Sequence, residues 1–123
     1  LCITYLMSGP ADLLEIQRLN SHLYVRLKEN VQFGRAAAFR DWLNDFTGGE
    51  DCRVVIDATE VMYINVMSLQ ALGETALFCS RKGGFLFIVN PSPYVRRTIH
   101  LSGLRLEIFA GVDDARAEIS RRF

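Results

Sequence analysis

Few residues of this chain could carry out chemistry, and they are widely spaced. The two histidines, His22 and His100, lie in separate predicted elements and lack the spacing of metal ligands. Cys2, Cys52 and Cys79 form no Cys-x-x-Cys pair, which predicts reduced thiols in a cytoplasmic protein and neither a disulfide framework nor a zinc site. We therefore predict no catalytic residue, no bound metal and no cofactor.

Two glycine pairs also fail to indicate a binding site for a nucleotide. Gly48-Gly49 and Gly83-Gly84 are too sparse for a dinucleotide or phosphate loop. Both stand where a predicted helix has to end, which is a common place for glycine. An enzyme or nucleotide hydrolase is therefore the least favoured of the functions considered.

Asp57 and Ser68 each have a functional and a structural interpretation. Asp57 follows a buried strand, at the end where open α/β sheets place functional loops, but it could simply accept hydrogen bonds from the next turn. If Asn65 caps a helix, Ser68 is the third helical residue, near the positive end of the helix dipole, where a phosphate is tolerated. Ser68 is thus a weak candidate phosphosite, with a small packed residue as the favoured alternative.

The helix predicted over Val66 to Arg81 has two faces of different character. Its inward stripe is predicted to consist of Leu69, Leu72, Ala76 and Cys79. The opposite face is predicted to carry Met67, Gln70, Ala71, Glu74 and Phe78. Exposed apolar side chains on one face indicate an interaction surface, and methionine suits adaptable contacts. Burial under a neighbouring helix and a homodimer contact are the alternatives.

The elements that position these residues follow from changes of hydrophobic period along the chain. Alternating or continuous apolar runs predict strands over 14–19, 23–28, 53–57, 85–89 and 104–109, with a tight turn at 20–22. Helical spacing predicts helices over 33–46, 66–81, 93–101 and 113–121. Asn65 and the Ser92-Pro93 pair are expected to start two of these helices.

This order of elements predicts an α/β fold. An opening antiparallel hairpin is followed by alternating helices and strands, and right-handed crossovers then make the central sheet mostly parallel, with about four helices. We expect residues 1–12 to form an N-terminal extension or an edge strand, and residues 13–123 to form one domain. The 123 residues suffice to bury a core without a metal or disulfides.

Composition narrows the range of partners. Half of the residues are hydrophobic and the formal net charge is zero, so no basic excess indicates nucleic acid or a membrane surface. The longest apolar candidate for a membrane span, Leu1 to Met7, is far shorter than the roughly 20 residues that a spanning helix needs. These features disfavour nucleic acid and a membrane as partners, and together with the reduced thiols they favour a cytoplasmic protein.

Residues 53–72 resemble the opening of the STAS domain family, which includes anti-sigma factor antagonists and the cytosolic domains of SulP anion transporters. Val54-Val55-Ile56-Asp57 matches the family strand that ends in Asp, and residues 63–69, YINVMSL, fall on the opening of its regulatory helix. Residues 89–95 and 101–104 resemble its asparagine-proline turn and its closing segment. The resemblance covers about residues 14–119 and implies the STAS fold.

The match departs from the family at its most informative position. Met67 stands where the antagonists carry the Ser or Thr that a partner kinase phosphorylates. Asn65 replaces the usual Asp, Val66 replaces the first Ser, and Ser68 replaces Gly. If the chain is an antagonist-type protein, its phosphorylation switch is therefore lost, moved or replaced.

The resemblance implies a non-enzymatic regulatory module that binds an anti-sigma factor or a kinase-like regulatory protein, with a homodimer as a further possibility. Asp57 would be the motif acid beneath the regulatory loop. The alternative is the regulatory STAS domain of a SulP-type sulfate or anion transporter, which residues 27–37 resemble in part; only then would a membrane be involved. The expected partner-binding residues are Tyr63, Asn65, Val66, Met67, Ser68, Gln70, Ala71, Glu74 and Phe78.

Overall fold

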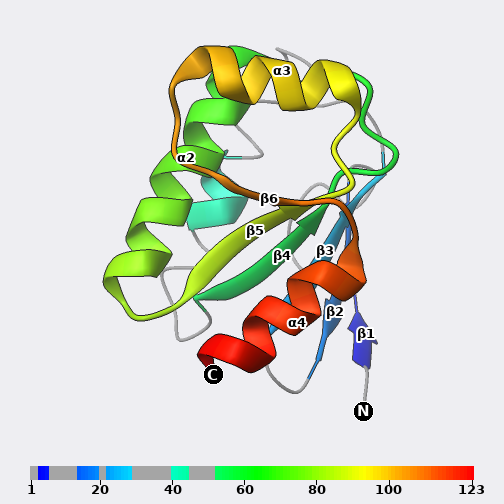
Figure 1. The fold of residues 1–123 in the computed structure, drawn as a ribbon, viewed down its shortest axis with the longest axis vertical. Helices are drawn as coiled ribbons and strands as arrows, with labels where there is room; N and C mark the ends of the chain where they lie inside the picture. The colour runs from blue at the N-terminus through cyan, green and yellow to red at the C-terminus, as the bar shows by residue number, and fades with distance from the viewer. Residues whose placement is uncertain (1–2, 6–13, 20–21, 29–39, 45–51) are drawn as a thin grey trace.

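A computed structural model describes residues 3–5, 14–19, 22–28, 40–44 and 52–123. In these ranges a twisted sheet runs through the molecule, with helices on both of its faces (Figure 1). The strands are β1 (Ile3–Tyr5), β2 (Leu14–Arg18), β3 (Leu23–Leu27), β4 (Arg53–Asp57), β5 (Phe85–Val89) and β6 (Glu107–Phe109). The labelled helices are α2 (Val66–Arg81), α3 (Pro93–Ser102) and α4 (Val112–Arg122).

The six described strands lie in the sheet in the order in which they occur in the chain. β1 pairs antiparallel with β2, and β2 pairs antiparallel with β3. From β3 onward the neighbouring pairs are parallel, with Leu23 beside Val54 and Arg53 beside Phe85. This confirms the predicted hairpin and parallel section, and Ile3–Tyr5 adds an edge strand from within the predicted N-terminal extension.

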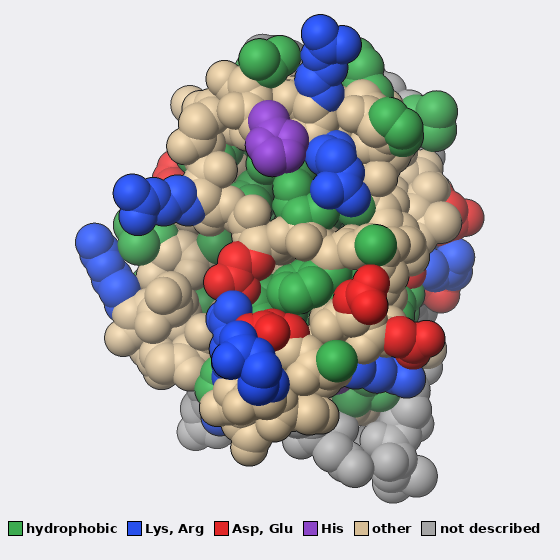
Figure 2. Space-filling model, in the orientation of Figure 1, with side chains coloured by type: hydrophobic (Ala, Val, Ile, Leu, Met, Phe, Trp, Pro, Cys, Tyr) green, Lys and Arg blue, Asp and Glu red, His purple; other side chains and the backbone are tan. Residues whose placement is uncertain are grey.

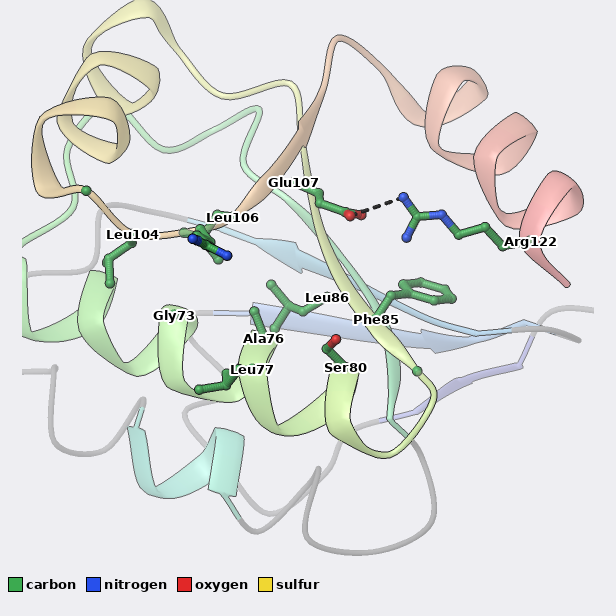
Figure 3. Close-up of a pocket in the computed structure, with 13 residues that line it drawn as sticks. Gly73, Ala76, Leu77, Ser80, Phe85, Leu86, Leu104, Leu106, Glu107 and Arg122 are labelled. Atoms are coloured by element: carbon green, nitrogen blue, oxygen red, sulfur yellow. Dashed lines mark hydrogen bonds and ion pairs between the residues drawn. The ribbon is translucent and has the colours of Figure 1, made fainter.

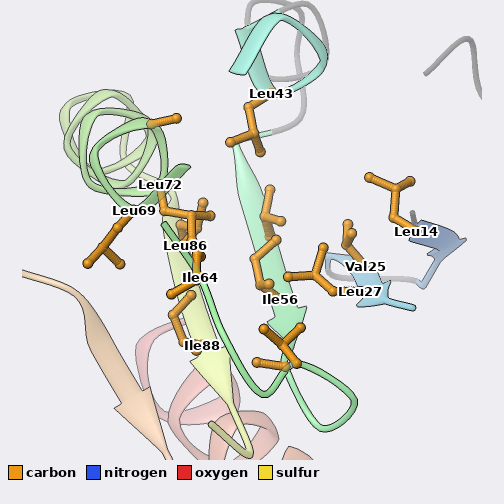
Figure 4. Close-up of a cluster of buried hydrophobic side chains, with 14 of the residues drawn as sticks. Leu14, Val25, Leu27, Leu43, Ile56, Ile64, Leu69, Leu72, Leu86 and Ile88 are labelled. Atoms are coloured by element: carbon orange, nitrogen blue, oxygen red, sulfur yellow. The ribbon is translucent and has the colours of Figure 1, made fainter. Parts of the chain in front are cut away.

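Alternation along β4 and β5 separates two hydrophobic clusters. Val54, Ile56, Leu86 and Ile88 point to one face, where they pack with α2, α3 and the described helical residues 40–44 (Figure 4). Successive right-handed crossovers to the next strand place their helices on the same face of a sheet, which explains why α2 and α3 share it. The second face carries Val55, Phe85, Phe87 and Val89, which α4 covers through Ala115 and Ile119.

Most predicted boundaries agree with the structure to within one residue, but two need comment. The strand predicted to begin at Leu104 begins at Glu107, because Leu104 and Leu106 pack on the core beside α2 and leave the line of the sheet. Residues 40–44 are helical, in agreement with the predicted helix over 33–46, whose remaining residues lie outside the described ranges. The same holds for residues 20–21 of the predicted turn.

Candidate interaction surface

The start of α2 is fixed by a side-chain cap. Asn65 has an extended backbone and its Oδ1 accepts a hydrogen bond from the backbone N–H of Ser68 at 2.8 Å. This is the geometry that makes Asn a favoured N-cap, because it satisfies one of the free N–H groups of the first turn. The predicted capping role of Asn65 is therefore confirmed.

The loop that leads into α2 is anchored at two points and exposed between them. Val61 and Ile64 are buried in the main cluster, and the Val61 N–H donates to the carbonyl of Ala58 at 3.0 Å. Met62 and Tyr63, which lie between the anchors, are exposed. Anchoring on both sides holds these two apolar side chains at the surface beside the first turn of α2.

Exposed apolar side chains gather around this end of α2. Val66 and Met67 open the helix with 64% and 41% of their surface exposed. The ring of Tyr63 lies 6.1 Å, centroid to centroid, from that of Tyr94 in the first turn of α3. Gln70, Glu74 and Phe78 continue along the solvent side of α2. We call this set the α2 surface: Met62, Tyr63, Val66, Met67, Gln70, Glu74, Phe78 and Tyr94.

Ala71 does not belong to the α2 surface, so its predicted place on the exposed face was wrong. It is 2% exposed and shares the main cluster with Trp42 and Leu43. α2 packs both on the sheet and against the helical residues 40–44, so its buried arc is wider than the single stripe of Leu69, Leu72, Ala76 and Cys79. The extra breadth buries Ala71, Ser68 and Thr75.

Ser68 is an unsuitable target for a kinase in this conformation. Its side chain is fully buried, and its Oγ has no hydrogen-bond partner among the described residues. A phosphate at this position would have no room and no counterion in the core. Ser68 therefore acts here as a small packed residue at the base of the loop, as the favoured alternative predicted.

Asp57 is also buried, and its carboxylate is occupied by neighbours. Thr59 donates to Asp57 Oδ1 from its backbone N–H at 2.9 Å and from its hydroxyl, and the Tyr24 hydroxyl donates to Oδ2. Burial, followed by this hydrogen bond to Asp57, raises the pKa of Tyr24 well above its usual value. These contacts match the structural interpretation of Asp57, in which it fixes the turn that follows β4.

An ion-pair network centred on Arg26 lies on the same face of the sheet as Asp57. Arg26 Nη1 is 2.8 Å from Glu60 Oε2, and its Nη2 also pairs with Glu15. The guanidinium thus joins β2, β3 and the loop after β4. The pairs are partly exposed to solvent, so each stabilises the fold only modestly.

The described residues bring together no set of three His, Cys, Asp or Glu side chains that could hold a metal ion. His22 lies at the start of β3 and His100 in the last turn of α3. Cys52 and Cys79 are buried and remain in the thiol form. Burial raises the pKa of Cys79 to about 12, so its reactive thiolate form is rare near neutral pH. No helix in the described part of the chain has the length and apolar character to cross a bilayer.

Several exposed apolar residues were missed by the sequence analysis, among them Met62, Leu77, Tyr94 and Leu101. For Tyr94 and Leu101 a signal existed. They are seven residues apart, and on a helical wheel they lie about 120–140° from the centre of the buried stripe of Val95 and Ile99, which places them on one exposed side of α3. Met62 carried no such signal, because the loop before α2 has no regular period.

The sequential sheet, the capped α2 and its exposed apolar end define an α/β domain with an apolar surface patch. A family model described as "STAS domain" matches residues 14–115. Since this match spans most of the chain, the protein belongs to the STAS domain family. A search of curated proteins finds no match.

Solved structures with the same fold include anti-sigma factor antagonists and part of an anion transporter. A Thermotoga maritima protein assigned as an anti-sigma factor antagonist has a TM-score of 0.82 at 21% identity, covering 88% of this chain and 95% of that one. The anti-sigma factor antagonist SpoIIAA in its unphosphorylated form gives 0.75 at 14%, covering 88% and 96%. The murine anion transporter Slc26a9 gives 0.72 at 20%, covering 85% of this chain but 18% of the transporter.

Proposed function

We propose that this domain is a regulatory protein-binding module without catalytic activity, which docks through the α2 surface on an anti-sigma factor or a related kinase-like protein in the cytoplasm. The observation that carries the proposal is the apolar end of α2, where Met62, Tyr63, Val66 and Met67 are exposed beside Tyr94. Monomeric proteins rarely expose so many large apolar side chains in one place unless a partner covers them.

Phosphorylation at residue 67, where the antagonists carry Ser or Thr, does not control this docking, because Met67 has no hydroxyl group. Met67 is 41% exposed, so a kinase could reach a side chain at this position, whereas Ser68 is buried beneath it. We infer that binding is either constitutive or regulated elsewhere. SpoIIAA has been solved in both unphosphorylated and phosphorylated forms, and serves as the phosphorylatable reference.

The test of docking is affinity capture with matched charge variants. Wild-type domain, a Met67→Glu, Phe78→Glu double variant and a Phe123→Glu control are immobilised, and the captured proteins are identified by mass spectrometry. Phe123 is an exposed aromatic residue at the end of α4, which lies on the other face of the sheet. We expect an anti-sigma or kinase-like protein on the wild type and on the control, but not on the double variant.

Equal capture by the double variant would reject the α2 surface as the docking site. The oligomeric state of the same three proteins, measured by analytical ultracentrifugation, tests the homodimer. A wild-type dimer that the double variant alone disrupts would make a second copy of this chain the occupant of the α2 surface.

Met67→Ser tests the missing switch. Incubated with the captured kinase and labelled ATP, this variant should be phosphorylated at residue 67 while the wild type is not. SpoIIAA with its own kinase provides the positive control for the assay. If Met67→Ser stays unlabelled, the kinase-binding surface has diverged beyond one side chain.

The alternative function is a regulatory STAS domain within a SulP-type anion transporter. The similarity to Slc26a9, in which the matching domain is a small part of the chain, favours keeping this candidate. Sequencing of the complete reading frame separates the two functions. About ten apolar spans encoded ahead of this domain would establish the transporter, and their absence would leave the regulatory module.

A further inference from the structure

A cavity of about 540 Å³ lies at the other end of α2, between this helix, β5 and the segment from α3 into β6 (Figure 3). Its size falls within the range of roughly 300–1,000 Å³ that is typical of small-molecule pockets. It is separate from the α2 surface, which occupies the solvent side and the N-terminal end of the helix. Its lining includes Leu77, Leu86, Leu104, Arg105, Leu106 and Glu107.

The cavity exists because β6 pairs with only part of β5. Their pairing begins at Phe87 with Glu107, although β5 itself begins two residues earlier at Phe85. Leu104 instead leans on α2, where it lies so close to Gly73 that an added Cβ would be 3.0 Å from Leu104 Cδ2. The chain between Gly103 and Glu107 therefore stands away from the start of β5 and leaves a space that is partly open to solvent.

The walls of this cavity are mostly apolar. Ala76 and Leu77 come from α2, Leu86 from β5, and Leu104 and Leu106 from the segment before β6. Figure 3 shows side chains of α2 and of this segment on opposite sides of the space, with Leu86 between them. An aliphatic or other apolar group placed here would be removed from water on several sides, which favours binding.

The polar groups of the cavity leave one positive charge available. Glu107 Oε1 accepts from Arg122 Nη2 at 3.1 Å, and Arg122 also pairs with Glu118, so both charges that close one end are already neutralised. Arg105 is exposed at the mouth and has no ion-pair partner among the described residues. The Ser80 hydroxyl adds a hydrogen-bonding group from the last turns of α2.

The position along α2 limits how much negative charge the cavity accepts. Of its α2 residues, Ser80 lies in the last turn of the helix, near the negative end of the helix dipole. A polyanion such as a nucleotide phosphate chain would meet this dipole with a single free guanidinium to balance it. One carboxylate, by contrast, matches one arginine, which forms strong charge-assisted hydrogen bonds to carboxylates.

We propose that this cavity binds a small amphipathic carboxylate, whose apolar chain lies among Leu77, Leu86 and Leu104 and whose carboxylate pairs with Arg105. The proposal does not depend on the proposed docking function, since the residues that carry it lie outside the α2 surface. A bound ligand would contact α2 directly, so it would change the position or rigidity of the helix that carries the α2 surface.

The experiment is calorimetric titration of the wild-type chain with decanoate, decanol and decyltrimethylammonium, each below its aggregation concentration. The three probes share an apolar chain and differ in the charge of the head group. We expect saturable binding of one decanoate per chain, with decanol at least about tenfold weaker and the cation weaker still, because Arg105 contributes about 1.4 kcal/mol or more to the carboxylate.

Two variants locate the site. Arg105→Gln should weaken decanoate binding about tenfold and leave decanol unchanged, whereas Arg97→Gln, which changes an exposed arginine of α3 outside the cavity, should leave both unchanged. Leu106→Trp should block all three probes by filling the space. Equal affinity for the three probes, an unchanged affinity of Arg105→Gln for decanoate, or no saturable binding would overturn the proposal. Docking on a protein partner is assayed separately, so either idea can fail alone.

Discussion

The hydroxyl of Tyr24 on β3 donates a hydrogen bond to the carboxylate of Asp57 at the end of β4, within the layer that faces α4. The two residues are 33 positions apart in the sequence. Their contact joins two parallel strands by side chains as well as by backbone pairing. It also orients the carboxylate whose other oxygen holds Thr59 and the turn after β4.

Tyr24→Phe should lower the free energy of unfolding by about 1.5–3 kcal/mol, the usual contribution of a hydrogen bond to a charged group. Urea denaturation at pH 7 measures the change. Asp57→Asn should lower the free energy of unfolding by at least as much, since it also weakens the hydrogen bonds that Thr59 donates to residue 57. In a double-mutant cycle the two losses should be clearly less than additive, and full additivity would show that the contact contributes nothing.

The cap at the start of α2 predicts different stabilities for two substitutions of Asn65. Asn65→Ala removes the acceptor for the Ser68 N–H and should destabilise the protein by about 1 kcal/mol. Asn65→Asp keeps this acceptor, places a negative charge at the positive end of the helix, and removes the buried Nδ2, which has no hydrogen-bond partner among the described residues. We expect Asn65→Asp to be as stable as wild type, by thermal unfolding. A loss equal to that of Asn65→Ala would show that burial of the charge outweighs the cap.

Stability should fall as the solution becomes alkaline. Burial raises the pKa of the Cys79 thiol to about 12 in the folded protein, against about 8.5 in an unfolded chain. Between these values the unfolded chain releases the proton and the folded chain retains it, so the free energy of unfolding decreases with rising pH, by up to about 1.4 kcal/mol per unit for one group. The raised pKa of Tyr24 acts in the same direction at higher pH.

Urea denaturation at pH 7.5, 9, 10 and 11 measures this dependence. Cys79→Ala should be less stable than wild type at pH 7.5, because it leaves a space in the core, but its stability should change less between pH 9 and 10. Parallel curves for the two proteins would show that Cys79 titrates normally in the folded state.

Gly84→Ala should be among the most damaging small substitutions. A Cβ at this position would lie 1.9 Å from the backbone oxygen of Cys52, which cannot move freely because it accepts the Phe85 N–H at 2.7 Å. We expect a loss of about 3 kcal/mol, at the upper end of the range for overpacking. Gly83→Ala is the matched control: it meets no neighbour but has a positive φ of 80°, and should cost about 1–2 kcal/mol. Equal losses would mean that the chain shifts to relieve the contact.

The elements of this fold could be predicted from sequence because local patterns and caps agree with the tertiary structure. β5 and the middle of β4, Val54 to Ile56, are apolar because both of their faces are covered, and Asn65 and Ser92 cap the helices as expected. Ala71 was misplaced because a helical wheel contains no information on how many neighbours a helix has. Leu104 was assigned to a strand because alternation alone does not reveal that its side chain packs on Gly73.

The candidate sites could be predicted from the sequence to different degrees. Met67 and Phe78 were predicted to be exposed, and are, because they lie opposite the core stripe whatever its exact width. The environment of Asp57 required a contact with Tyr24 from another strand, which no local pattern encodes. The cavity beside Arg105 depends on where β6 stops pairing with β5, and that point is set by packing on α2.

The sequential order of the strands bears on how the chain folds during synthesis. Each described strand pairs with the strands just before and after it in the chain: Arg18 with Leu23 five residues later, Leu23 with Val54, and Phe87 with Glu107. In the described sheet, no strand has to wait for a partner from the far end of the protein. The hairpin of β2 and β3 can form first, and each later strand can join the edge as it leaves the ribosome, so loop-closure entropy is lost in small steps.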